Sequence, residues 1–119
     1  MELENKIDPE LTELFKKGIN KTIFDLHEIL TVKSAEYWRN DNPFHNFETG
    51  ARITGEYPEK VLYGFLLKHL VSLQDIINDL PKKKVPKKII DEKITDITIY
   101  LLVLKELLYY NYGYDHYGD

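Results

Sequence analysis

The sequence predicts an all-α protein, with one domain over residues 1–108. Two observations carry this prediction. Apolar residues recur at intervals of three and four over long stretches, and prolines and a glycine fall where such stretches begin or end. No convincing strand pattern interrupts them. We therefore expect an antiparallel helical bundle of three long helices and one short helix, without a sheet.

The first long helix is expected over residues 9–38. Asp8 is a suitable N-cap, Pro9 fits the first helical position, and Glu10 is an acid in the first turn. The apolar positions that follow repeat at helical spacing, and they are Leu11, Phe15, Ile19, Ile23, Leu26 and Leu30. The helix should end before the turn-rich stretch at residues 39–46.

Three further helices complete the predicted bundle. A short helix is expected over residues 47–54, where Gly55 can end it in the left-handed conformation. Long helices should follow over residues 57–80 and 87–108, joined by a connector rich in lysine and proline. The aromatic, glycine-interrupted segment 109–119 is expected to form a C-terminal tail outside the helix.

The last predicted helix is apolar on two faces. One face contains Ile90, Ile94, Ile97, Leu101, Leu104 and Leu108. The other contains Ile89, Ile99, Tyr100, Val103 and Leu107. A helix of this kind lies at the centre of its bundle or is covered by a second subunit. In so small a domain we expect a homodimer or a higher homo-oligomer, assembled through this helix.

Composition excludes several classes of function. The chain has 119 residues, no cysteine and a net charge of −4. Without cysteine there is no disulfide framework, thiolate metal site or thiol nucleophile. The acidic balance argues against a nucleic-acid partner. No apolar run is long enough to span a bilayer, so we expect no membrane partner and a cytoplasmic location.

Glu92 and Asp96 are four residues apart on the last predicted helix, so their side chains project from one stripe. The other members of that stripe are apolar, and they are Ile89, Ile99, Val103 and Leu107. A carboxylate against apolar surface is costly unless a cation, a metal ion or a hydrogen-bond donor meets it. The pair predicts an acidic site, and an ordinary solvated pair is the alternative.

A second irregularity is that the apolar stripe of the first helix continues into Lys33 and Tyr37. The lysine can reach solvent from the end of the bundle. Alternatively it is a cation at the mouth of a pocket, where it would meet phosphate or a carboxylate. Glu36 lies beside this stripe. In the loop that follows, Asn46 and Phe47 are suited to contacting a sugar or stacking on a base.

On the second long helix, Lys68 lies on a polar stripe with Ser72, Asp75 and Asp79. A solvated face is the simplest interpretation of this stripe. His69 lies at the margin of the apolar face, where a satisfied core histidine is a better interpretation than a metal ligand. Neither residue indicates a function by itself.

Four segments together resemble a known family. They are KSAEY at 33–37, NPFHNF at 42–47, GFLLKH at 64–69 and EKITDITIYL at 92–101. They are similar to a nucleotide-modification-associated domain that is frequent in phage and prophage genomes. That domain is related to the MazG-like all-α nucleoside triphosphate pyrophosphohydrolases. The resemblance covers roughly residues 26–108 and is most specific in the segment at 92–101.

The resemblance implies a fold, an activity and a set of residues. The fold would be MazG-like, with Mg²⁺ held by Glu92 and Asp96, both of them catalytic. Glu36 would complete the metal shell, with Glu28 and Asp75 as the alternatives. Lys33 and Lys68 would contact the phosphates, so that with the aromatic loop they form a nucleotide site. The implied activity is a Mg²⁺-dependent (deoxy)nucleoside triphosphate pyrophosphohydrolase that acts on a cellular or phage nucleotide pool. For a phage-encoded chain, the location would be the host cytoplasm.

The chain departs from the MazG pattern in two ways. It lacks the Glu-Glu-x-x-Glu motif of an early helix, and Glu92 and Asp96 are one residue further apart than in Glu-x-x-Asp. Two alternatives to the enzyme therefore remain open. One is a phage nucleotide-binding protein without catalysis, such as a sink for a signal nucleotide. The other is a helical interaction module whose second apolar face is a protein interface.

Overall fold

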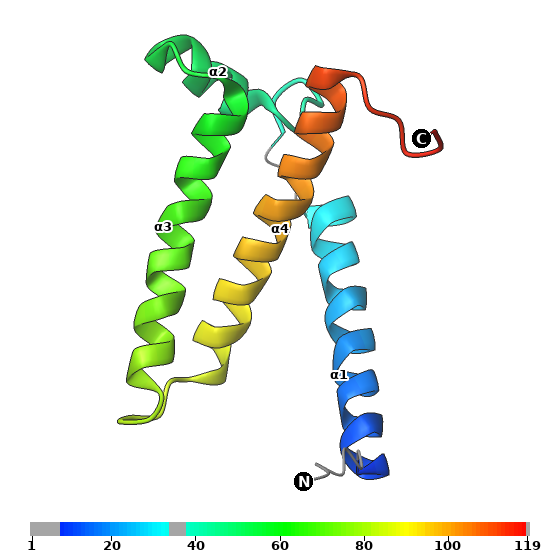
Figure 1. The fold of residues 1–119 in the computed structure, drawn as a ribbon, viewed down its shortest axis with the longest axis vertical. Helices are drawn as coiled ribbons and strands as arrows, with labels where there is room; N and C mark the ends of the chain where they lie inside the picture. The colour runs from blue at the N-terminus through cyan, green and yellow to red at the C-terminus, as the bar shows by residue number, and fades with distance from the viewer. Residues whose placement is uncertain (1–7, 34–37, 119) are drawn as a thin grey trace, which may run out of the picture. The chain divides into compact units, whose positions relative to one another are not determined.

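The computed structural model describes residues 8–33 and 38–118, and every regular element among them is helical (Figure 1). The predicted all-α class is confirmed. The two stretches belong to separate compact units that divide between residues 36 and 37, so each is described by itself. The arrangement of all these helices in one antiparallel bundle over residues 1–108 stays a prediction. Among the described helices, none combines the length and apolar character that crossing a membrane requires.

Helix α1 spans Pro9–Glu28 and continues as a π-helical segment, η1, over Ile29–Lys33. Its start is as predicted. The Asp8 carboxylate accepts a hydrogen bond from the backbone N–H of Glu10 at 3.0 Å, and Pro9 occupies the first turn. This bond satisfies one of the N–H groups that lack a partner inside the helix.

The C-terminal part of this first helix departs from the prediction. Ile29, Thr31 and Val32 are β-branched and lose side-chain freedom in a helix. The Thr31 hydroxyl also donates to the carbonyl of His27 at 2.7 Å, which favours a local bend. These features coincide with the change to π geometry. The prediction that this helix continues to Trp38 is wrong, because Trp38 lies in no helix.

Helix α2 spans His45–Thr54 and begins two residues before the predicted start. The preceding turn explains the earlier start, because the side-chain amide of Asn42 donates to the Glu48 carboxylate at 2.7 Å. The helix ends as predicted. Gly55 adopts a φ of 75° and its N–H donates to the carbonyl of Ala51 at 2.8 Å.

Helix α3 spans Pro58–Asp79 and helix α4 spans Lys87–Tyr112. The boundaries of α3 agree with the prediction within one residue. The end of α4 requires a correction, because the helix continues four residues beyond Leu108. Gly113 then ends it, with a φ of 76° and its N–H donating to the carbonyl of Tyr109. The aromatic tail therefore starts at Gly113.

Helices α3 and α4 form a hairpin in which the start of α3 lies beside the end of α4 (Figure 1). There the Tyr112 hydroxyl donates to the Glu59 carboxylate. The buried core at this end consists of Phe47 from α2, Leu62 from α3 and Leu107 from α4. Partly buried residues around it are Phe44, Val61, Tyr100, Val103 and Leu104. This core holds α2, α3 and α4 together at this end of the hairpin.

Candidate functional site

A polar cluster lies between α3 and α4, and His69 is at its centre. The His69 side chain is only 25% exposed. Its Nδ1 is 3.2 Å from Nζ of Lys93 and 3.9 Å from a carboxylate oxygen of Asp96. Because an ammonium group can only donate, the contact with Lys93 requires Nδ1 to be an acceptor. A cation and a carboxylate thus approach the same ring nitrogen.

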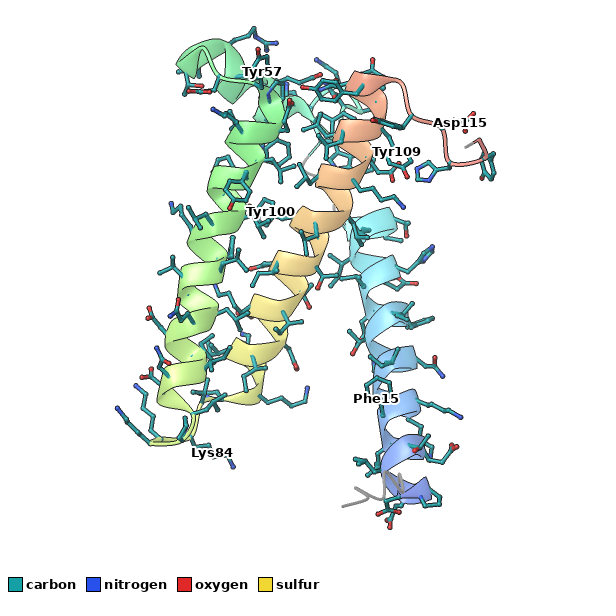
Figure 2. The ribbon with its side chains drawn as sticks, in the orientation of Figure 1. Phe15, Tyr57, Lys84, Tyr100, Tyr109 and Asp115 are labelled. Atoms are coloured by element: carbon teal, nitrogen blue, oxygen red, sulfur yellow. The ribbon has the colours of Figure 1, made fainter. Side chains whose placement is uncertain are left out.

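Tyr100 lies between α3 and α4 (Figure 2), and its ring contacts both His69 of this cluster and Phe47 of the core. Its ring is nearly parallel to that of Phe65, at 7° with 6.4 Å between centroids, and lies 5.1 Å from the ring of His69. Burial raises the pKa of Tyr100, and the negative charge of Asp96 raises it further. The phenol therefore keeps its proton at neutral pH and remains a hydrogen-bond donor.

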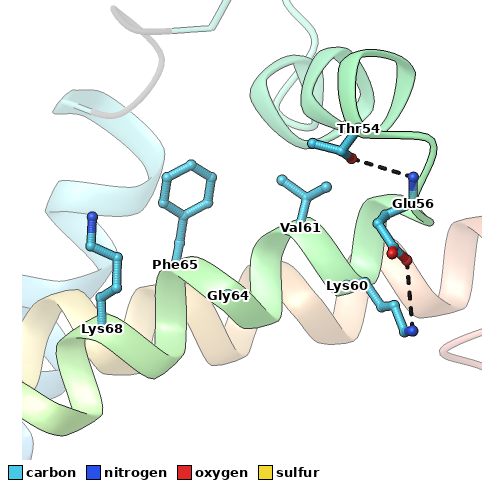
Figure 3. A pocket seen from close by; sticks show the side chains of 7 residues that line it. All are labelled: Thr54, Glu56, Lys60, Val61, Gly64, Phe65 and Lys68. Atoms are coloured by element: carbon cyan, nitrogen blue, oxygen red, sulfur yellow. Dashed lines mark hydrogen bonds and ion pairs between the residues drawn. The ribbon is translucent and has the colours of Figure 1, made fainter.

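A groove of about 270 Å³ opens along α3 beside the end of α2 (Figure 3). Its lining residues are Thr54, Glu56, Lys60, Val61, Gly64, Phe65 and Lys68. Nζ of Lys60 is 3.6 Å from the Glu56 carboxylate. By contrast, no described residue forms a hydrogen bond or an ion pair with Lys68. Of the two lysines that line the groove, Lys60 is therefore paired with Glu56, whereas Lys68 has no partner among the described residues.

The two predicted acids have different surroundings. Glu92 is 58% exposed, and its carboxylate is 3.8 Å from Nζ of Lys88, one turn earlier on the same helix. Asp96 is 47% exposed and is directed toward His69 on α3. Glu92 thus behaves as a member of an ordinary solvated pair. Asp96 alone lies at the contact between helices.

The residues predicted to bind the base and the phosphates also differ in whether a ligand can reach them. Lys68 lines the groove, and Asn46 is exposed in the first turn of α2. Phe47 is only 8% exposed, and its ring meets those of Phe65 and Tyr100 edge-on. It therefore belongs to the core and is not available to stack on a base. This corrects the prediction, and the cause is that the apolar face of α2 turns Phe47 toward α3 and α4.

Three predicted site residues cannot be placed. Glu36 and Tyr37 lie outside the described residues. Lys33 ends η1, but its side chain is outside the described part of the chain. The predicted cleft that these residues would share with Glu92 and Asp96 therefore stays a prediction.

The donor chemistry around Asp96 is compatible with a divalent cation, although it is incomplete. Within residues 8–33 and 38–118, no group of three or more His, Asp or Glu side chains could hold a metal ion. Asp96 and Glu92 nevertheless provide carboxylates on consecutive turns of α4. Mg²⁺ usually takes only one or two carboxylates from a protein and completes its shell with water and phosphate oxygens.

Sequence reasoning missed the contact of Lys93 with His69 and the exposed ring of Phe65. The available signal was weak. Lys93 lies between the two acids in sequence, and His69 is at the margin of an apolar face. Only the pairing of α3 with α4 brings these residues together.

Comparisons of the chain with protein-family models, curated proteins and solved structures found no match. The polar cluster at Asp96 and the groove at Lys68 are the features of the molecule that indicate a function.

Proposed function

We propose that the protein binds a nucleoside phosphate on the α3–α4 hairpin, beside Asp96. The observation that carries the proposal is the half-exposed Asp96 carboxylate facing His69 of the opposite helix, with Lys93 on the same imidazole. Because Nδ1 of His69 accepts from Lys93, it cannot also donate to Asp96, so the Asp96 oxygens remain available to a metal ion.

Mg²⁺ suits this site because it is a hard cation that prefers carboxylate oxygens. Asp96 would supply one ligand. Glu92 would supply a second after its side chain leaves Lys88, which is a weak exposed partner at 3.8 Å. When bound, the ion would neutralise phosphate charge and lower the pKa of a bound water.

The cationic groups of the chain would hold the phosphates. The Lys93 ammonium has three donors and uses one of them on His69. Lys68 has no partner among the described residues. These two lysines concentrate positive charge on a hairpin that belongs to an acidic chain of net charge −4. The protonated phenol of Tyr100, whose ring lies against that of His69, adds a neutral donor.

Two functions share this binding mode. With hydrolysis, the protein is a MazG-like, Mg²⁺-dependent pyrophosphohydrolase of a cellular or phage nucleotide pool, as the family resemblance implies. Without hydrolysis, it is a nucleotide sink. The solvated position of Glu92 and the missing early acidic motif favour the sink. Nucleotide binding is therefore common to both functions, and hydrolysis of the bound nucleotide distinguishes them.

The test is a panel of ribo- and deoxyribonucleoside triphosphates, with and without Mg²⁺, measured by thermal denaturation and pyrophosphate release. At a ligand concentration ten times Kd, binding stabilises the fold by about 1.4 kcal/mol. For a chain of 119 residues this raises Tm by about 6 °C. Stabilisation with pyrophosphate release identifies the enzyme, and stabilisation alone identifies the sink. Failure of every triphosphate to stabilise the chain refutes the proposal.

Two variants on α4 make the test specific. Asp96→Asn removes the charge of the central carboxylate and should abolish the Mg²⁺-dependent stabilisation. Asp91→Asn makes the same chemical change at an exposed acid that pairs with Lys87 on the same helix. The Asp91 variant should bind like the unmodified chain. If both variants bind equally well, Asp96 is not part of the binding site.

A second candidate function is a helical interaction module that forms a homo-oligomer through α4. It is favoured by apolar side chains of α4 that remain uncovered, since Ile94, Leu101 and Leu102 are 41%, 51% and 39% exposed. Leu101→Glu should therefore lower the assembly state measured by sedimentation. Lys84→Ala, which changes the net charge equally in an exposed turn, should not. A chain that is monomeric at micromolar concentration would contradict this candidate.

A further inference from the structure

The groove on α3 contains an open space beside a helical glycine. A methyl group at Gly64 would meet no other atom within 4 Å. Gly64 also needs no special backbone conformation, because among the described glycines only Gly55 and Gly113 have a positive φ. Gly50 is different, since a methyl group there would lie 2.8 Å from Val61 Cγ1. Glycine inside a helix is less stable than alanine, and no described contact requires it at position 64.

The ring of Phe65 borders this open space. It is 41% exposed, although it is also nearly parallel to Tyr100 and meets Phe47 edge-on at 6.0 Å between centroids. Figure 3 shows it on the same side of α3 as Val61 and Lys68. A ring that is held by core residues and yet partly exposed provides a rigid surface for stacking.

Lys68 places an available positive charge at one end of the groove. It lies one turn beyond Gly64, which corresponds to about 6 Å along the helix axis. Lys60, one turn before Gly64, is instead paired with Glu56 at 3.6 Å. The groove therefore changes along its length from an apolar, open floor to an ammonium group that has no partner among the described residues.

We propose that this groove is the base-binding part of the nucleotide site. The base lies over Gly64 and against Phe65, and the phosphates extend toward Lys68. This inference rests on the proposed function and adds the orientation of the nucleotide. The space of about 270 Å³ is smaller than pockets for drug-sized ligands, which measure about 300–1,000 Å³. It fits one planar ring system and leaves the charged phosphates outside.

The orientation also connects the groove with the polar cluster. Phe65 of the groove lies one turn before His69, the centre of that cluster, on the same side of α3. The rings of Phe65 and His69 both lie against Tyr100, at 6.4 and 5.1 Å between centroids. One aromatic side chain thus supports both the surface for the base and the imidazole that faces Asp96.

The experiment is to fill the open space without unfolding the helix. Gly64→Leu places a large side chain in the groove, whereas Gly64→Ala adds one methyl group and is the matched control. Both substitutions increase helix propensity, so both variants should retain or increase Tm. Calorimetric titrations in Mg²⁺ then compare the common nucleoside triphosphates with inorganic triphosphate, which has no base.

The expected result separates the base from the phosphates. The unmodified chain should bind its preferred nucleotide at least about tenfold, or 1.4 kcal/mol, more tightly than inorganic triphosphate. Gly64→Leu should lose that advantage while its affinity for inorganic triphosphate stays unchanged, and Gly64→Ala should retain it. Lys68→Ala should weaken both ligands.

Two other results have distinct meanings. If the unmodified chain binds a nucleotide and Gly64→Leu binds it equally well, the base lies elsewhere, and only the present inference fails. If neither nucleotides nor inorganic triphosphate bind to the unmodified chain, the proposed function fails and this inference fails with it.

Discussion

Replacing Leu107 by alanine should remove a large part of the stability of the fold. The Leu107 side chain is fully buried against Phe47 and Leu62, at the point where three helices meet. Truncating a buried leucine costs about 3 kcal/mol, from lost transfer free energy and the cavity left behind. For 119 residues the entropy of unfolding is about 0.25 kcal/mol/K, so Tm should fall by about 12 °C.

The matched control is Leu101→Ala, which is the same substitution on the same helix at a side chain that is 51% exposed. It should cost less than about 1 kcal/mol, as surface substitutions generally do. Urea denaturation followed by far-UV circular dichroism, at low protein concentration, measures both values. An equal loss for the two variants, or a larger one for Leu101→Ala, would refute the assignment of the core.

Three further predictions concern a helix start, a helix end and a titrating group. Asp8→Ala removes the hydrogen bond that the Glu10 N–H donates, so α1 should lose about 1 kcal/mol of stability. The helical signal in far-UV circular dichroism should decrease accordingly. Gly55→Ala places a side chain at a φ of 75°, so the free energy of unfolding should fall by about 1 kcal/mol in urea denaturation, and an unchanged value would contradict this backbone geometry. The pKa of Tyr100 is raised from 10.0, by burial first and by Asp96 second, so the folded chain keeps a proton that the unfolded chain loses. Stability should therefore fall as pH rises above about 10 and through the folded pKa, and Tyr100→Phe should reduce this slope in denaturation at several alkaline pH values.

The candidate site could be predicted only in part. Asp96 and Lys68 were identified from sequence, and both lie in places where a ligand can reach them. Glu92 shares its stripe with Asp96, but it is solvated and paired with Lys88. Sequence spacing places two side chains on the same side of one helix. The spacing does not determine which of the two side chains is covered by a neighbouring helix, because that depends on where the two helices meet.

Local chemistry in the sequence determined the helices and most of their ends. Asp8 and Pro9 start α1, Pro58 starts α3, and Gly55 ends α2, because each satisfies or removes a backbone group within its own turn. The start of α2 is an exception, because it depends on the Asn42 side chain reaching Glu48, a contact beyond one turn.

The tertiary structure decided which side chains are buried and which meet. The periodicity of α4 marks Leu101 and Leu107 as equally apolar, yet one is half exposed and the other fully buried. Phe47 looked available for a base until the packing of three helices enclosed it. His69 meets Asp96 only because α3 pairs with α4 in one register. A helix repeats every 3.6 residues whatever it packs against, so burial and long-range contacts depend on the arrangement of the helices in space.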